Sequence, residues 1–142
     1  MKKYKIIIDT NVLVSGLKSR LGASYKLLSS LNDERIQLFL SNSLLFEYEE
    51  ILKRNNHLVN LDLNEIDSLL DDICAIASTK NIFYLWRPTT SDPDDDFIVD
   101  LAIASNIDYI ITFNVSNFLN AKKMNIKTIT PKEFLQLLGG IQ

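Results

Sequence analysis

The chain has 142 residues, a length that fits one domain, and we expect a single domain over residues 1–142. Hydrophobic residues make up 46% of it, with only 4 Gly and 3 Pro, which excludes a disordered or fibrous chain. The formal net charge of -3 argues against a pure nucleic-acid-binding module, because such modules need a basic surface to neutralise phosphates.

The sequence favours a cytoplasmic protein without a membrane segment. A single cysteine, Cys74, cannot form a disulfide framework, which fits a reducing compartment. The basic start is followed by a short apolar run that ends at Asp9, so it does not make a secretory signal. No apolar run approaches the roughly 18 residues of a membrane-spanning helix.

The first half of the chain alternates short apolar runs with helical patterns. β-Branched and aromatic residues fill Tyr4 to Ile8, which predicts a buried strand that ends at Asp9. Helices are then predicted at residues 12–17, 22–31, 44–53 and 64–77. A strand is predicted at residues 37–40 and a polar connection at residues 55–63. Asn64 is expected to cap the fourth helix. The second helix is expected to bury the face that carries Tyr25, Leu28 and Leu31.

The second half continues the alternation. Strands are predicted at residues 82–85, 109–112 and 128–129, and helices at residues 94–105 and 134–138. Loops are predicted at residues 87–93 and 113–120, the second of them polar. Thr130 and Glu133 have the spacing of a capping box, with Pro131 at the first helical position. Because short apolar strands alternate with helices, the sheet should be mostly parallel.

Acidic and amide side chains fall where such a sheet would bring them together. Ligands of parallel sheets bind beyond the carboxyl ends of the strands. The residues at these places are Asp9 after the first strand, Glu47 in the helix after the second, the run Asp94-Asp95-Asp96 before the fourth, and Asn114 after it. Clustered carboxylates repel one another unless cations bind them, and Mg²⁺ or Mn²⁺ prefers such oxygen ligands. A metal-bound water could then attack a phosphodiester bond.

Each of these residues also has a purely structural interpretation. Asp9 could simply cap the helix after it, and Glu47 could belong to a solvated acidic helix face. The Asp94-Asp95-Asp96 run could complement the dipole of its helix. Asp100, one turn beyond Asp96, could extend the site or face solvent.

Other catalytic classes lack their motifs. The single histidine, His57, has no Cys or His partner with which to bind zinc. Neither a G-x-S-x-G elbow nor a nucleotide-binding glycine motif occurs. A phosphoaspartyl phosphatase would need Asp-x-Asp after its first strand, whereas Asp9 is followed by Thr10 and Asn11.

Segments that span nearly the whole chain carry a resemblance to a known family. They are Ile6-Ile7-Ile8-Asp9-Thr10-Asn11-Val12-Leu13-Val14-Ser15, Leu40-Ser41 with Glu47, Asp92-Pro93-Asp94-Asp95-Asp96 with Ala102, and Asp108-Tyr109-Ile110-Ile111-Thr112. In this order and spacing they resemble PIN domains. The closing Ile129-Thr130-Pro131-Lys132-Glu133-Phe134-Leu135 resembles the branch of toxin components from bacterial toxin–antitoxin systems.

The resemblance implies a three-layer α/β/α fold and metal-binding carboxylates at Asp9, Glu47 and one residue of the aspartate run. Asp95 is favoured because it stands seven residues before Ala102, as in similar proteins, and Asp96 is the alternative. The family's usual fourth acid corresponds to Asn114 here. Asparagine keeps an oxygen but lacks the negative charge, so a second metal should bind more weakly and activity could be reduced or lost.

The resemblance also implies a function and partners. The first hypothesis is an Mg²⁺- or Mn²⁺-dependent endoribonuclease that cleaves single-stranded RNA, a toxin neutralised by an antitoxin protein, with homodimerisation through the helix of residues 66–77. The second is a PIN-like module that binds RNA or protein without cleavage, which Asn114 favours. The candidate RNA contacts are Lys18, Arg20, Lys26, Lys53 and Arg54.

Overall fold

The computed structural model describes residues 3–80, 96–115, 118 and 126–139, without the side chains of residues 79, 80 and 96. The strands are β1 (Tyr4–Ile8), β2 (Ile36–Ser41), β3 (Ser78–Lys80), β4 (Tyr109–Ile111) and β5 (Lys127–Ile129). The helices are α1 (Thr10–Lys18), α2 (Ala23–Ser29), α3 (Asn42–Arg54), α4 (Asn56–Val59), α5 (Leu63–Ile76), α6 (Asp96–Ser105) and α7 (Pro131–Leu137). No helix in this described part of the chain is long and apolar enough to cross a membrane.

The strands form one parallel sheet in the order β3-β2-β1-β4-β5. β1 lies at its centre because Ile6, Ile7 and Ile8 are apolar on both faces, and each is at most 2% exposed. The chain moves outward from β1 to β2 and β3, then returns to the other side of β1 with β4 and β5. The order therefore reverses between β1 and β4, and the carboxyl ends of these two strands are where such sheets bind ligands.

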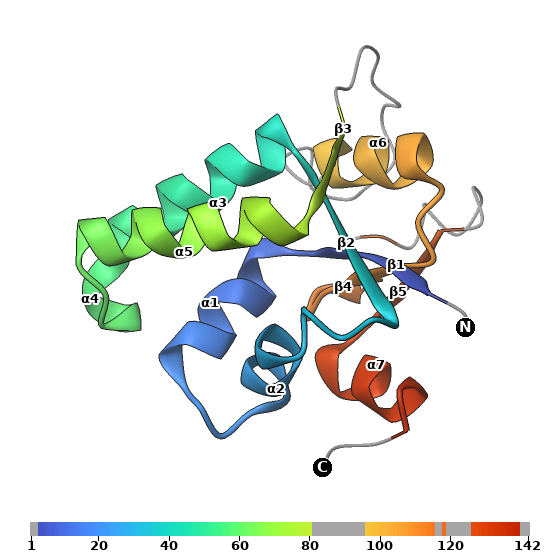
Figure 1. The fold of residues 1–142 in the computed structure, drawn as a ribbon, viewed down its shortest axis with the longest axis horizontal. Coiled ribbons are helices and arrows are strands. Elements are labelled where there is room, and N and C mark those ends of the chain that lie inside the picture. The colour runs from blue at the N-terminus through green and yellow to red at the C-terminus, as the bar shows by residue number, and fades with distance from the viewer. Residues whose placement is uncertain (1–2, 81–95, 116–117, 119–125, 140–142) are drawn as a thin grey trace.

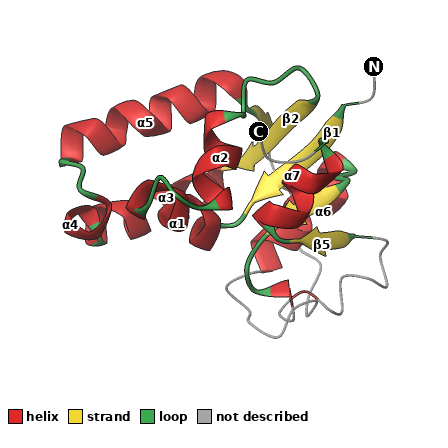
Figure 2. Cartoon of the chain, turned by 90° about the horizontal axis from the view of Figure 1, so that it is seen from below, coloured by secondary structure: helices red, strands yellow, loops and turns green. Residues whose placement is uncertain are grey.

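Helices cover both faces of the sheet, which confirms the predicted three-layer α/β/α architecture (Figure 1). Below the sheet in Figure 1, α1 packs on α2 and α2 packs on α7, while α3 packs on α5 and α6 above it. The view from below places α2 and α7 in front of the strands (Figure 2). Near the carboxyl end of β1, α1 also contacts α3, so a helix from each layer meets at this edge.

Side chains cap the first turns of α3 and α7, and the cap of α7 confirms a local prediction. Thr130 and Glu133 form the predicted capping box of α7. Ser41 caps α3, as its hydroxyl accepts from the backbone N–H of Leu44 at 3.2 Å. The face of α6 that carries Ile98, Leu101, Ala102 and Ser105 is buried.

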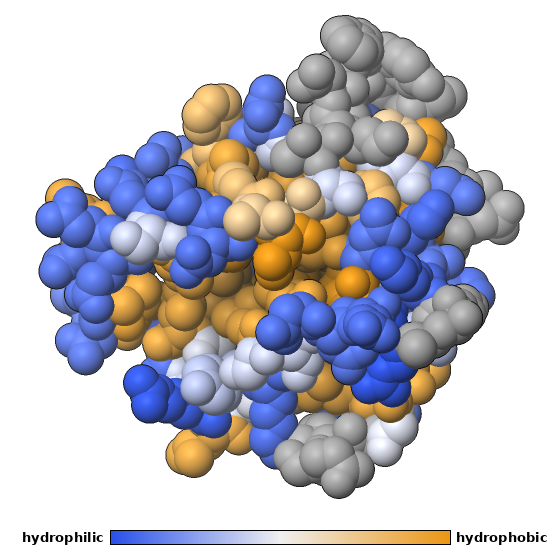
Figure 3. All heavy atoms as spheres, viewed as in Figure 1, coloured by the Kyte–Doolittle hydropathy of each residue, from blue (hydrophilic) through white to orange (hydrophobic). Residues whose placement is uncertain are grey.

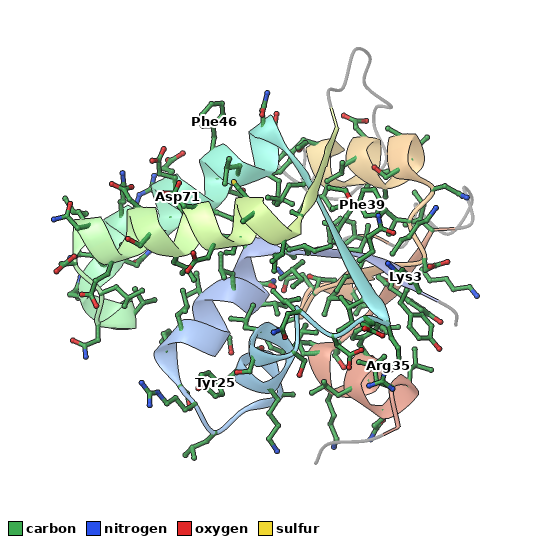
Figure 4. The ribbon with its side chains drawn as sticks, in the orientation of Figure 1. Lys3, Tyr25, Arg35, Phe39, Phe46 and Asp71 are labelled. Atoms are coloured by element: carbon green, nitrogen blue, oxygen red, sulfur yellow. The ribbon has the colours of Figure 1, made fainter. Side chains whose placement is uncertain are left out.

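The carboxyl-terminal helix α7 is held against the strands by aromatic packing and by one arginine. The Phe134 ring lies 5.8 Å from that of Tyr4 and 6.2 Å from that of Tyr109, both in edge-on contacts. Arg35, labelled beside α7 in Figure 4, donates from Nη1 to the carbonyl of Leu138 at 2.7 Å. These contacts attach the last helix to β1, β4 and the turn before β2.

Three predictions of local structure are wrong. The fourth predicted helix, α5, is capped by Asp62 rather than Asn64, because Glu65 completes a capping box with Asp62. The expected polar connection of residues 55–63 contains α4, which ends at a left-handed residue, Asn60. In α2 the buried side chains are Ser24 and Leu27, whereas Tyr25 and Leu28 are only partly buried, and of the predicted face only Leu31, which follows the helix, is buried.

The third strand lies earlier than expected. β3 occupies Ser78–Lys80 and pairs with β2 in parallel. The predicted strand at residues 82–85 and the loop at 87–93 lie outside the described residues.

Candidate functional site

A cleft of about 540 Å³ opens at the edge of the sheet where the strand order reverses. It is bounded by α1, by α3 and by the segment after β4. Its lining residues are Asp9, Thr10, Asn11, Val14, Ser15, Lys18, Ser19, Glu47, Ile51 and Asn114. Asp9, Glu47 and Asn114, which the sequence predicted to converge, thus line one cleft although they are up to 105 positions apart in the chain.

Asp9 both caps α1 and lines the cleft. One carboxylate oxygen, Oδ1, accepts from the backbone N–H of Thr10 at 2.8 Å, and Oδ2 accepts from the Thr112 hydroxyl at 2.7 Å. The Asp9 N–H donates to the carbonyl of Ile111 at 2.9 Å. With 5% of its surface exposed, Asp9 is fixed by the ends of both central strands. Asp9 therefore caps α1, as its structural interpretation proposed, and it also lines the cleft.

Glu47 reaches the cleft from α3 and is anchored by α1. The Thr10 hydroxyl donates a hydrogen bond to Oε2 of Glu47. The neighbouring acids point elsewhere, since Glu49 pairs with Lys53 and Glu50 pairs with Arg54. The solvated acidic face considered for this helix therefore accounts for Glu49 and Glu50, whereas Glu47 belongs to the cleft.

A buried tyrosine links the two walls beneath these carboxylates. The Tyr48 hydroxyl donates to the carbonyl of Ile8, the last residue of β1, and Tyr48 is 1% exposed. Burial raises the pKa of Tyr48 well above its ordinary value, and the negative charges of Asp9 and Glu47 raise this pKa further. The phenol therefore remains neutral and keeps its hydrogen to donate. Both carboxylates act on the same buried group, so their negative potentials overlap at this end of the cleft.

Asn114 enters the site through Thr112. The backbone N–H of Asn114 donates to the Thr112 hydroxyl at 3.0 Å, and that hydroxyl in turn donates to Asp9. Asn114 itself is exposed, and the backbone N–H of Phe113 lies 3.5 Å from Oδ1 of Asn11. The chain after β4 is thus tied to both Asp9 and Asn11. Thr112 was not singled out as a site residue from the sequence, although it stands two positions before Asn114.

The remaining acidic predictions have different outcomes. Asp95 lies outside the described residues, as does the side chain of Asp96, the first residue of α6. Asp100 is 1% exposed, so the interpretation that it faces solvent is wrong. It is not among the residues that line the cleft.

The donor set of the cleft suits a hard divalent cation. Asp9 and Glu47 supply carboxylate oxygens, and Asn114 supplies an amide oxygen, which are the ligand types of Mg²⁺ and Mn²⁺. A bound cation would also offset the overlapping negative potentials of the two carboxylates. Within the described residues, no group of three or more Asp, Glu, His or Cys side chains is arranged to hold a metal. The described residues fit a metal site as two of its acidic ligands.

A second hollow of about 460 Å³ lies between α1 and the first half of α5. Leu17, Leu61 and Leu69 make its apolar part, and its acidic residues are Asp62, Glu65 and Asp72. Figure 3 shows apolar side chains exposed across this face, bordered by hydrophilic ones.

Comparisons with known proteins agree with this geometry. A family model described as PIN domain matches residues 5–116. The uncharacterized protein MJ1680 of Methanocaldococcus jannaschii is 27% identical over 146 residues, which cover 94% of this chain and 91% of that protein. The solved structure of VapBC2 from Rickettsia felis, bound to a DNA fragment from their promoter, matches with a TM-score of 0.58 and 16% identity. That match covers 87% of this chain and 96% of the other, and it shows a shared fold.

Proposed function

Because the chain belongs to the PIN domain family, whose members are generally nucleases that use divalent metals, we propose that it is an endoribonuclease that cleaves single-stranded RNA with Mg²⁺ or Mn²⁺. The observation that carries this proposal is the convergence of Asp9, Glu47 and Asn114 on one cleft. We further propose that residues 1–142 form one such domain, since a single sheet takes strands from both halves of the chain.

The chain's own residues would bind the cation and orient the reactants. Asp9 and Glu47 are the proposed metal ligands, joined by Asp95, which lies outside the described residues, or by Asp96, the first residue of α6. When bound, the metal would lower the pKa of a coordinated water and stabilise negative charge on the phosphate. The two threonine hydroxyls, Thr10 and Thr112, hold one oxygen of each carboxylate, which leaves the orientation of both carboxylates fixed before substrate binds.

Asn114 is proposed to orient the attacking water or to contact the metal through its amide oxygen. An amide cannot accept a proton as a carboxylate does, so Asn114 is not the general base of the reaction. With one negative charge fewer, the site should prefer one tightly bound metal over two.

The test is cleavage of a mixed set of single-stranded RNAs by the purified protein with Mg²⁺, with Mn²⁺ and with EDTA. The decisive variant is Glu47→Gln, which keeps an oxygen to accept from Thr10 but removes the charge. Its matched control is Glu50→Gln, which removes a charge from the same helix outside the cleft. We expect cleavage that needs metal, that falls at least about 100-fold in Glu47→Gln and that stays within about twofold in the control.

Asp9→Asn gives the second arm of the test. An amide oxygen can still cap α1, so the variant should fold, as circular dichroism would verify, while its cleavage is lost. Metal-independent cleavage, or full activity of both site variants, would exclude the assignment of the cleft as the catalytic site.

A toxin role is proposed because residues 129–135 resemble the toxin branch of the family and because the fold is shared with VapBC2, whose structure was solved bound to promoter DNA. An antitoxin protein would neutralise the enzyme by covering the acidic end of the cleft, with a basic side chain placed between Asp9 and Glu47. Co-expression with a candidate antitoxin protein would test this, since an antitoxin should restore growth and co-purify with the chain. A cytoplasmic location is proposed with it, because the RNA substrate is there.

A homodimer is proposed through the outer surface of α3 and α5. Phe46 is 65% exposed and projects outward from α3 (Figure 4), and Ile76 on the adjacent α5 is 46% exposed. Large apolar side chains exposed on neighbouring helices are typical of a protein interface. Light scattering that shows a monomer at micromolar concentration would contradict it.

A second candidate function is a PIN-like module that binds RNA without cutting it. Asn114 in the cleft is the specific observation that favours it, because among the described residues after β4 the one that lines the cleft is uncharged. Metal-dependent RNA binding without cleavage by folded protein would support this alternative.

A further inference from the structure

The cleft extends well beyond its acidic end. Successive turns of α1 line it in pairs, first Thr10 and Asn11, then Val14 and Ser15, then Lys18 and Ser19. Nine residues separate Asp9 from Lys18, and at 1.5 Å per residue this is about 13 Å along the helix. The cleft therefore follows one face of α1 from its cap to its last turn, with Ile51 of α3 on the other wall.

Lys18 is the single cation among the described residues that line this cleft. It is exposed, and it forms no ion pair with any residue that the structure describes. Two other basic candidates are occupied, since Lys53 lies 3.0 Å from Glu49 and 2.9 Å from Asp67, and Arg54 pairs with Glu50. The charge in the cleft is thus divided, with carboxylates at one end and an available ammonium group at the other.

From this arrangement, and resting on the proposed ribonuclease function, we propose that Lys18 binds a backbone phosphate of single-stranded RNA that flanks the bond to be cut. The hydroxyls of Ser15 and Ser19 lie on the same wall and can donate to oxygens of that phosphate or of the adjoining ribose. Because the helical rise places Lys18 about 13 Å along α1 from the cap at Asp9, we assign its ammonium group to a flanking phosphate rather than to the scissile one. It fixes the direction in which the strand runs along α1 and so selects substrates that continue past the cut.

The test measures binding of a short mixed-sequence single-stranded RNA in EDTA, where cleavage is prevented, over a range of salt concentrations. Each phosphate contact contributes about 0.7 to the slope of log affinity against log salt for a single strand. Lys18→Gln should therefore lower the slope by about 0.7 and weaken binding about fivefold at about 0.1 M salt. Lys18→Arg should retain the wild-type slope, since guanidinium also binds phosphate.

Lys132→Gln is the matched control, because it removes the same charge from an exposed residue of α7 that does not line the cleft. A slope that falls equally in Lys18→Gln and Lys132→Gln would mean that only net charge matters, and it would overturn the proposal. An unchanged slope in Lys18→Gln, or no binding by any form at low salt, would overturn it as well.

Cleavage separates this proposal from the proposed function. If the wild type cleaves RNA, Lys18→Gln should raise KM about fivefold with little change in kcat, because Lys18 contacts a part of the substrate that does not react. If the wild type cleaves RNA but the slope is unchanged, only the role of Lys18 fails. If the slope falls as expected while no form cleaves RNA, the binding role stands and the nuclease function fails.

Discussion

The Thr112 hydroxyl makes a sharp test of how the cleft is built, because it joins two chain segments that meet only in the folded protein. Thr112 is 0% exposed, donates to Oδ2 of Asp9 at 2.7 Å and accepts from the N–H of Asn114 at 3.0 Å. Thr112→Val keeps the size of the side chain and removes both bonds. A hydrogen bond to a charged group is worth roughly 1.5–3 kcal/mol, and water can replace the bond to the exposed Asn114. We therefore expect a loss of about 2 kcal/mol in the free energy of unfolding.

Thr112→Ser is the control, because it keeps the hydroxyl and loses only a buried methyl group. That loss should cost about 1 kcal/mol, so the serine variant should be the more stable of the two. Urea unfolding followed by circular dichroism gives both values, with the midpoint shifting at constant slope. A double-mutant cycle with Asp9→Asn should show a coupling of about 1–2 kcal/mol between the two positions. Equal stability of the valine and serine variants, or additive effects in the cycle, would refute the reasoning.

Two further predictions concern stability away from the cleft. Gly16→Ala should destabilise the protein by about 1 kcal/mol in urea unfolding, because a Cβ there would lie 2.5 Å from the Leu28 side chain and 3.1 Å from the backbone of α2. Gly22→Ala is the control and should be nearly neutral, because open space surrounds Gly22. A gain in stability for Gly16→Ala would contradict the prediction. Hydrogen bonds from Arg35 lower the pKa of Asp33 from 3.8 to about 2, so the ion pair stabilises the folded protein above pH 3.8, and this stabilisation is lost as the pH falls towards 2. The difference in the free energy of unfolding between the wild type and Asp33→Asn should therefore shrink between pH 3.8 and pH 2. A difference that stays constant over this interval would show that the ion pair is not its cause.

Local chemistry made part of this structure predictable. The all-apolar run of β1 places it in the centre of the sheet, and an aspartate at its end is both a good helix cap and a ligand at a carboxyl end. Helix position and the resemblance both pointed to Glu47, but Glu49 and Glu50 lie on the same helix, so the sequence pattern alone did not separate it from a solvated acidic face. In the structure its position one residue before the buried Tyr48 directs it towards α1.

Other features depend on competition between similar signals. Asp62 and Asn64 are both good helix caps, and the glutamate three residues after Asp62 was the signal that decided in its favour. The face of α2 was mispredicted because two helical turns define a periodicity poorly. In the structure, the side chain of Leu28 and the backbone of Ser24 approach Gly16 of α1, and this contact between helices, which local periodicity does not encode, sets the face that α2 turns towards α1.

Contacts between distant segments could not be predicted from local pattern at all. The bond between Thr112 and Asp9 spans 103 positions and depends on the register in which Ile8 pairs with Ile111. The same register brings the backbone N–H of Phe113 to the side chain of Asn11. A period-2 or period-3.6 pattern carries no information about register between two central strands that are apolar on both faces.

The central place of β1 has a consequence for the timing of synthesis. The first strand made is the middle of the sheet, and one of its two neighbours, β4, begins more than 100 residues later. At about 5–20 residues per second, the ribosome needs roughly 5–20 s to extend the chain from Asp9 to Thr112. Until then the carboxylate of Asp9 lacks the hydroxyl that orients it, and the cleft lacks its third wall. A nascent chain must therefore be extended by about 100 residues beyond Asp9 before it can acquire the activity proposed for it, which leaves time for a neutralising partner to be made.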